Sequence, residues 1–282
     1  MRWRGERQSG NIEDHRGMGR GGKLAVGGGL GAIIVLVIGL LTGRDISGLM
    51  QALPSGQETT VSPGLQERGP DDSTAQFVSV VLASTEDVWR EIFRKNNARY
   101  EEPVLRMFEH ATNSACGGAS SAMGPFYCPA DQKVYIDLSF CTELRERFNA
   151  PGNFAIAYVV AHEVGHHVQN LMGLSEQVQR QRSRLSEAEY NKLSVKQELQ
   201  ADFFAGLWAH HAQRSRNLIE PGDMEAALRA ANAIGDDKLQ QEAQGYIVPD
   251  AFTHGTSAQR MYWFRKGFET GDLNQGKYQD IQ

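Results

Sequence analysis

An apolar run near the start of the chain predicts a membrane anchor. Residues 24–43 carry no charge and include the unbroken stretch from Ala32 to Ile38. A helix needs about 20 apolar residues to cross the hydrocarbon core of a bilayer. A cleavable signal peptide is the alternative, but such a peptide ends in small residues of the Ala-x-Ala type, which are missing around Thr42 to Asp45. We therefore expect residues 24–43 to form a transmembrane helix.

The pattern after this run predicts a linker and then a folded domain with both helices and strands. Proline, glycine and serine are frequent in residues 44–75, which is typical of a flexible linker. The capping signal at Ser84 is followed by apolar positions at helical spacing, which predicts a helix to about Asn97. Apolar and polar residues then alternate from Val134 to Ser139, which predicts a strand.

The remaining hydrophobic periodicity is helical. One helix is expected to start at Asn153, after a proline and a glycine, and to stop at Gly173. Another is expected to start at Ser194, where Gln197 completes a capping box, and to end near His211. Further helices are expected over residues 223–233 and 258–267, with a loop at residues 252–257. Together these elements predict an α+β domain over residues 76–282.

Charge is distributed unevenly and predicts an orientation. Residues 1–23 contain six basic and three acidic side chains, so the net charge of −5 leaves about −8 on the rest of the chain. That balance argues against nucleic acid as a partner. By the positive-inside rule, the basic residues keep 1–23 in the cytoplasm as a tail and place the folded domain outside it.

Three cysteines, Cys116, Cys128 and Cys141, suit an oxidising compartment as one disulfide and one thiol. Cys116 with Cys128 is the preferred pair, because the short loop between them can close without strain. Three buried, unpaired cysteines are the alternative.

The residues His162-Glu163-Val164-Gly165-His166 form the H-E-x-x-H pattern inside the first of the two long helices. Histidines four residues apart share one helical face, so both imidazoles can bind one metal ion. Glu163 is rotated by about 100° from His162, and it can reach a water on the metal rather than bind the metal. The pattern predicts zinc held by His162 and His166, with Glu163 as the catalytic base.

Glu198, 32 residues after His166 on the other long helix, is the expected third ligand, because catalytic zinc is commonly bound by two histidines and a glutamate with a fourth position open. Asp202 lies one helical turn later on the same face. We expect its carboxylate to accept the second ring N–H of a ligand histidine. An exposed acidic stripe is the alternative interpretation of these two residues.

The chain resembles the bacterial family of putative neutral zinc metallopeptidases, single-pass membrane proteins of the zincin superfamily. The resemblance runs over nearly the whole chain and is carried by residues 1–14, 124–129, 134–140, 161–169, 197–206 and 252–260. It implies a zincin-like fold, Zn²⁺, peptide or protein substrates, and a bacterial inner membrane protein whose catalytic domain is periplasmic or extracellular. The spacing of Glu198 and Asp202 is similar to that of thermolysin, and no third histidine follows at the metzincin spacing.

The histidines outside the H-E-x-x-H pattern differ in their expected roles. His167 points away from the metal face, and His210 and His211 lie near a helix end, where cationic side chains are favourable. His254 lies in a loop of the family-like C-terminal stretch and is assigned a catalytic role in the transition state. Tyr262 and Arg260 are weaker candidates for the same role.

The sequence therefore predicts a membrane-anchored zinc metalloendopeptidase that hydrolyses peptide bonds. An extended peptide is expected to dock on the strand Val134 to Leu138, taken as the edge of the sheet. A membrane-tethered scaffold with a structural zinc is the alternative, although such a site would need no Glu163. A di-iron carboxylate bundle needs a second Glu-x-x-His pair, which the sequence does not supply.

Overall fold

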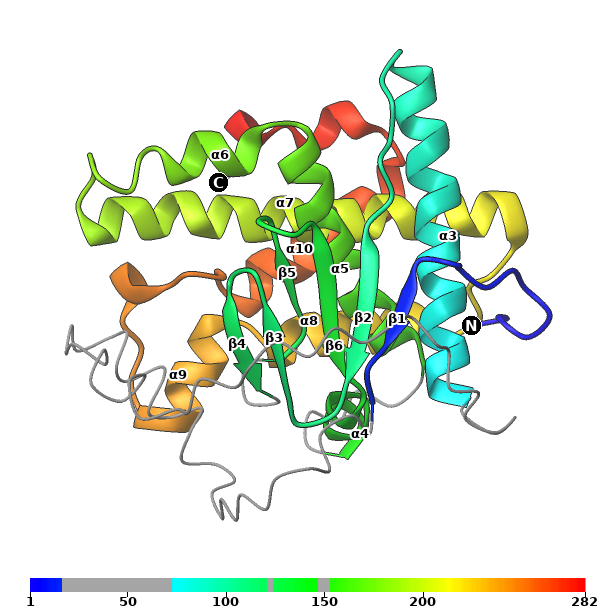
Figure 1. Ribbon diagram of the computed structural model, residues 1–282. Coiled ribbons are helices and arrows are strands. Elements are labelled where there is room, and N and C mark those ends of the chain that lie inside the picture. The colour runs from blue at the N-terminus through cyan, green and yellow to red at the C-terminus, as the bar shows by residue number, and fades with distance from the viewer. Residues whose placement is uncertain (17–72, 121–123, 147–152, 282) are drawn as a thin grey trace.

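The computed structural model describes residues 1–16, 73–120, 124–146 and 153–281. These residues form a mixed α and β fold that is mostly helical (Figure 1). Within them, no helix is both long and apolar enough to cross a membrane. The predicted anchor, residues 24–43, lies outside the described residues, as does nearly all of the predicted linker.

One four-stranded sheet forms the centre of Figure 1, in the order β1, β2, β6, β5. Strands β1, β2 and β6 run parallel, and β5 is antiparallel to β6. Their bounds are Ile12–Asp14 (β1), Val104–Phe108 (β2), Phe126–Cys128 (β5) and Lys133–Asp137 (β6). A separate hairpin is made by Ala111–Ser114 (β3) and Gly117–Ser120 (β4).

The strand predicted at residues 134–138 is confirmed as β6 over residues 134–137, whereas Leu138 already begins helix α4. The predicted place of this strand at the sheet edge is wrong. β2 pairs with one side of β6 along its whole length and β5 pairs with the other side. Both sets of backbone groups are therefore already used in the sheet. Val134 and Ile136 pack into the core below it, as the alternation predicted.

The helix that carries the H-E-x-x-H pattern is α5 (Asn153–Leu171), with the bounds that the sequence predicts. Nearly all of its side chains are buried, because α5 packs against α3, α7 and α8 as well as against β5 and β6. Gly173, in the left-handed region at φ 74°, follows its end. A helix surrounded on all sides in this way holds its polar side chains in fixed positions.

The second long helix, α7 (Glu187–Arg216), begins earlier and ends later than predicted. Its capping box is made by Ser186 and Glu189, eight residues before the predicted pair of Ser194 and Gln197. The Ser194 hydroxyl instead bonds back to Tyr190 O inside the helix, at 3.4 Å. The helix is thus long enough to cross the whole fold (Figure 1).

The first helix of the domain, α3 (Ser73–Lys95), begins eleven residues before the predicted start at Ser84. Ser84 and Thr85 are buried inside it and do not cap it. The Ser84 hydroxyl accepts a hydrogen bond from Trp208 Nε1 at 3.0 Å, and the Thr85 hydroxyl donates to Leu82 O at 2.7 Å. Both polar groups are satisfied by packing, which a local capping pattern does not show.

Helix α10 (Ser257–Thr270) starts at the capping box of Thr256 and Gln259 and packs closely on α7. Gly206 of α7 and Gly267 of α10 permit this close approach. A Cβ atom added to Gly206 would lie 2.0 Å from Phe264 O, and one added to Gly267 would lie 2.1 Å from Phe203 O. The contact fixes α10 directly over the part of α7 that carries Asp202.

The remaining elements surround this core. They are Leu138–Glu146 (α4), Leu174–Gln179 (α6), Asp223–Ala233 (α8), Asp236–Gln244 (α9), Pro249–Ala251 (η2), Leu273–Gly276 (η3) and Tyr278–Asp280 (η4). Helix α8 has the bounds that the sequence predicts.

Two further features bear on the predictions. Cys116 and Cys128 form a disulfide, which confirms the preferred pair, and Cys141 is a buried thiol outside that disulfide. Residues 1–16, expected to belong to a separate tail, lie against α3 and complete the sheet through β1 (Figure 1).

Candidate metal centre

Three of the predicted site residues meet between α5 and α7. His162 Nε2 lies 3.2 Å from Glu198 Oε2, and His166 Nε2 lies 3.3 Å from Glu198 Oε1. One ligand atom from each of the three residues falls within 4.8 Å of the others, and no further group of this kind occurs within the described residues. Two imidazoles and a carboxylate are a standard zinc donor set, so the arrangement fits the metal that the motif predicts.

The electrostatics of this cluster suit a cation. Burial alone would raise the pKa of Glu198, but His166 and His254 hold it well below its usual value. Burial would likewise lower the pKa of His162, yet Asp202 and Glu198 raise it to about 10. In the protein without metal, protons on the histidines therefore balance the carboxylates, and a metal ion would take the place of those protons.

Each histidine of the cluster is oriented through its other ring nitrogen. His162 Nδ1 donates to Asp202 Oδ1 at 2.9 Å, as predicted for Asp202. His166 Nδ1 donates to Gln169 Oε1 at 2.9 Å, and the amide of Gln169 in turn donates to Gln197 O at 2.7 Å. Both Nε2 atoms are thereby turned towards Glu198 in the tautomer that metal binding needs.

The support for His166 was not predicted. Gln169 is fully buried, and it follows His166 by three residues on α5. That spacing places the two side chains on one helical face, so the signal was present in the sequence. A buried glutamine beside a ligand histidine could have been proposed as its orienting group.

Asp202 is itself held by two residues that the sequence did not connect to it. Arg260 Nε donates to Asp202 Oδ2 at 2.9 Å and Arg260 Nη2 donates to Oδ1 at 3.1 Å. Tyr158 Oη donates to the same Oδ1 at 2.5 Å. Burial would raise the pKa of Asp202, but the charges of Arg260 and His162 lower it. Asp202 is therefore an anion whose two carboxylate oxygens both accept hydrogen bonds.

Glu163 lies next to the cluster of His162, His166 and Glu198 and is not part of it. Its side chain is buried, at 8% exposure, and within the described part of the chain no hydrogen bond to it is found. Burial raises its pKa above the ordinary value for glutamate, while the nearby histidines oppose that shift. A carboxylate with free oxygens and a raised pKa is suited to take up and return a proton near neutral pH.

His254 is outside the cluster of three but close enough to affect it. Its imidazole is half exposed, and Nδ1 lies 3.2 Å from Asp236 Oδ1. Partial desolvation would lower the pKa of His254, but Glu198 and Asp236 raise it. Asp236, which no sequence pattern indicated, also accepts the backbone N–H groups of Thr253, His254 and Gly255 at 2.7, 2.6 and 3.1 Å, so it holds the whole loop.

The other candidates lie elsewhere. His167 Nδ1 bonds to Tyr127 Oη and its Nε2 to Glu101 O, at 3.0 and 2.6 Å, so it is a neighbour and not part of the cluster. Arg260 is buried behind Asp202, and Tyr262 is 57% exposed on α10. The structure thus gives Arg260 a supporting place and gives Tyr262 no contact with the ligands.

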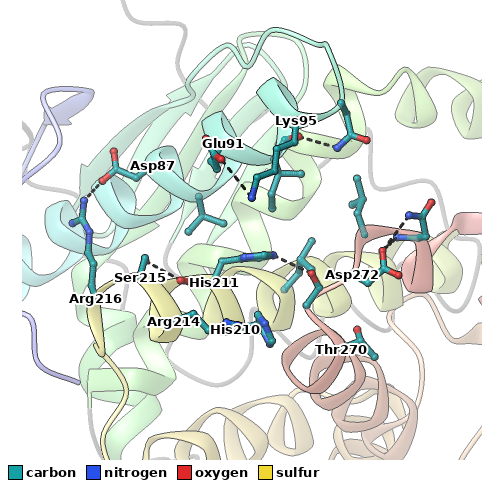
Figure 2. Close-up of a pocket in the computed structure, with 17 residues that line it drawn as sticks. Asp87, Glu91, Lys95, His210, His211, Arg214, Ser215, Arg216, Thr270 and Asp272 are labelled. Carbon is teal, nitrogen blue, oxygen red and sulfur yellow. Dashed lines mark hydrogen bonds and ion pairs between the residues drawn. The ribbon is translucent and has the colours of Figure 1, made fainter.

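A pocket of about 780 Å³ lies away from the metal centre, between α3, the last turns of α7 and η3 (Figure 2). His211 Nε2 donates to Gly271 O at 3.0 Å at its wall, and Arg216 pairs there with Asp87. His210 and His211 belong to this pocket, and neither approaches His162 or His166.

Comparisons with known proteins agree along the whole chain. The model of a family described as "Putative neutral zinc metallopeptidase" matches residues 1–278. The chain is 47% identical over 283 residues to the uncharacterized protein YpfJ of Escherichia coli K12, with 96% of each chain covered. It is 38% identical over 247 residues to the uncharacterized protein Rv2575 of Mycobacterium tuberculosis H37Rv, with 83% of each covered. No solved structure matches.

Proposed function

Because the chain belongs to the family of putative neutral zinc metallopeptidases, we propose that it hydrolyses peptide bonds at a zinc ion held by His162, His166 and Glu198. The single observation that carries this proposal is the convergence of the three ligand side chains beside Glu163. That glutamate is buried and has no hydrogen bond within the described residues. A metal-holding set needs no such group, whereas hydrolysis does.

Zinc bound in this way supplies Lewis acidity, which makes a water molecule more acidic and polarises a carbonyl group. The residues of the chain supply the rest. His162 and His166 present Nε2, because their Nδ1 atoms are engaged by Asp202 and Gln169. Glu163 would accept a proton from the attacking water at a carboxylate oxygen and deliver it to the leaving amine.

His254 is proposed as the residue that stabilises negative charge on the substrate carbonyl oxygen in the transition state. Its Nδ1 is held by Asp236, which leaves Nε2 as the atom that can donate to a substrate. In the metal-free protein Glu198 and Asp236 raise its pKa against the effect of desolvation. An imidazole N–H directed at the carbonyl oxygen is the kind of donor that this role needs.

Peptides or proteins are the proposed substrates, and their sequence is left open. Because β6 is paired on both sides, the edge of the central sheet nearest to it is β5, a strand of three residues. Attachment to a membrane through residues 24–43 remains a prediction from the sequence.

A membrane-tethered scaffold with a structural zinc is the competing function. A structural zinc site usually closes its fourth position with a protein ligand. Within the described residues the cluster offers three ligands, and Asp202 is occupied by Arg260, Tyr158 and His162. The open fourth position favours the peptidase.

The test replaces Glu163 by Gln and measures zinc content and hydrolysis of an unstructured protein on the same preparation. Glutamine keeps the shape of the side chain but cannot accept the proton, so the rate should fall by about 10²- to 10⁴-fold while zinc remains bound. Glu187→Gln, an exposed position at the start of α7, is the matched control and should change neither. Hydrolysis that persisted in Glu163→Gln would assign the activity to another base. A zinc-loaded parent inactive on every peptide would favour the scaffold.

A further inference from the structure

The first 16 residues form part of the same folded body as the metal centre. Strand β1 extends the sheet by pairing in parallel with β2. Leu105 N donates to Asn11 O at 2.9 Å, and His15 N donates to Met107 O at 2.8 Å. A strand in a sheet contributes backbone hydrogen bonds that both partners need. β1 therefore belongs to the domain and is not an appendage of it.

A buried carboxylate on α3 depends on this segment. Glu86 is 1% exposed, and it receives hydrogen bonds from the side chains of Arg7, Ser9 and Asn11, with the Arg7 and Asn11 contacts at 2.9 Å. Among the described residues, every side-chain donor to Glu86 comes from residues 7–11. An ionised carboxylate in such a place needs these partners. The α3 surface is thus built to receive the N-terminal segment.

A second set of ion pairs fixes the register of β1. The carboxylate of Glu13 accepts hydrogen bonds from Lys133 Nζ of β6 at 2.6 Å and from Arg106 Nε of β2 at 2.7 Å. Closer to the start of the chain, the Trp3 ring meets the Phe77 ring edge-on at 5.6 Å between centroids. Apolar, charged and backbone contacts all place residues 1–16 against residues 73–137.

The same contacts use the basic side chains on which the predicted orientation rests. Arg7 pairs with Glu86 and Asp87, Arg16 pairs with Asp14, and Arg2 lies 3.7 Å from Glu220. Their charges are compensated within the fold. They are therefore weaker evidence for a cytoplasmic tail than a count of basic residues suggests.

A single membrane crossing by residues 17–72 would place residues 1–16 and the domain on opposite sides, where these contacts cannot form. The sequence offers no second span to restore them, because the longest charge-free run between residues 44 and 72 is residues 46–57, well short of the about 20 residues that a helix needs. We propose that residues 1–16 and residues 73–281 lie on the same side of the membrane, in place of the opposite sides expected from charge.

The test labels exposed cysteines in intact bacterial cells that express the full chain. Gln8→Cys reports on the N-terminal segment, and Ser183→Cys, in the exposed turn after α6, reports on the domain. A membrane-impermeant maleimide is applied before and after the inner membrane is permeabilised. The parent chain is the blank, since Cys141 is buried and Cys116 is joined to Cys128.

We expect both positions to be labelled under the same condition, and either shared condition supports the proposal while also identifying the compartment. Labelling of one position before permeabilisation and of the other only afterwards would overturn it. Hydrogen exchange of the full chain in lipid nanodiscs is the second measurement. The amides of Leu105 and His15 should exchange at least tenfold more slowly than those of an unpaired segment, whereas unprotected amides at both would also overturn the proposal.

Discussion

Arg260 of α10 binds both carboxylate oxygens of Asp202 on α7, 58 residues away in the chain, at 2.9 and 3.1 Å. Asp202 in turn orients His162 through Nδ1. The tautomer of a proposed zinc ligand is therefore fixed by a side chain from a third helix. Close packing at Gly206 and Gly267 brings that helix within reach.

Replacing Arg260 should weaken zinc binding although Arg260 is not one of the proposed ligands. In Arg260→Lys, a single ammonium group replaces the two-pronged contact, so Asp202 loses its fixed orientation. We expect zinc affinity to fall by about 10- to 100-fold, as for the loss of other groups that orient ligands. Competition with a chromophoric chelator measures the change, and Arg265→Lys on the exposed side of α10 is the control. Equal zinc affinities in the two variants would show that Arg260 does not support the metal centre.

Replacing Glu198 by Ala should abolish stoichiometric zinc binding. His162 and His166 would remain, but two imidazoles without the carboxylate that bridges them in the metal-free protein are a weak site. Metal analysis after dialysis is the measurement, and His162→Ala and His166→Ala should give the same result. If Glu198→Ala kept its zinc while replacement of another carboxylate removed it, the third ligand would be misassigned.

Zinc binding should release protons at slightly alkaline pH. Asp202 and Glu198 raise the pKa of His162 to about 10 in the metal-free protein, so this imidazole is still protonated at pH 8. Coordination requires the neutral form, and about one proton or more should leave for each zinc bound. Calorimetric titration in two buffers of different ionisation enthalpy counts them. Asp202→Asn removes the negative charge that raises the pKa of His162, so fewer protons should be released when zinc binds.

Much of this centre could be predicted from the sequence, because the ligands lie at fixed spacings on two helices. His162, His166, Glu198 and Asp202 lie on faces set by helical periodicity alone. Arg260 and Asp236 could not be placed in that way. Their contacts depend on how α10 packs against α7 and how α9 packs against α8 and α10, and no local pattern encodes that packing.

The errors in the fold have the same origin. Ser84 and Ser194 both resemble helix caps, yet each lies inside a helix with its hydroxyl satisfied by another group. The strand β6 shows the alternation of a half-exposed strand, but its pairing on both sides depends on β2 and β5. Local capping and alternation are weak where tertiary partners satisfy the same polar groups.

Acid should weaken the docking of β1. Burial would raise the pKa of Glu13, but Lys133 and Arg106 lower it below the ordinary value for glutamate. A carboxyl with a lowered folded pKa stabilises the fold at pH values above its unfolded pKa, and this stabilisation is lost as pH falls through the folded pKa. The difference in melting temperature between the parent and Glu13→Gln should therefore be largest near pH 6 and shrink below about pH 4. A constant difference across this range would exclude Glu13 as the source.

The last prediction concerns His254, whose proposed role is to act on substrate and not on the metal. Its imidazole is outside the ligand cluster and is held by Asp236 at 3.2 Å. In His254→Ala, zinc content should therefore equal that of the parent. The rate constant kcat should fall by about 10²- to 10³-fold, the usual loss when one donor to a developing negative charge is removed, with little change in KM.

Asp236→Asn separates this role from a purely structural one. Asparagine keeps an oxygen that can accept the backbone N–H groups of residues 253–255, so the loop should stay in place. It loses the charge that helps to raise the pKa of His254, an effect second to that of Glu198. If protonated His254 is the active form, the alkaline limb of the kcat profile should move to lower pH in Asp236→Asn. A variant with a lower kcat at every pH but an unmoved limb would show that Asp236 only holds the loop. A His254→Ala enzyme as active as the parent would exclude His254 from catalysis.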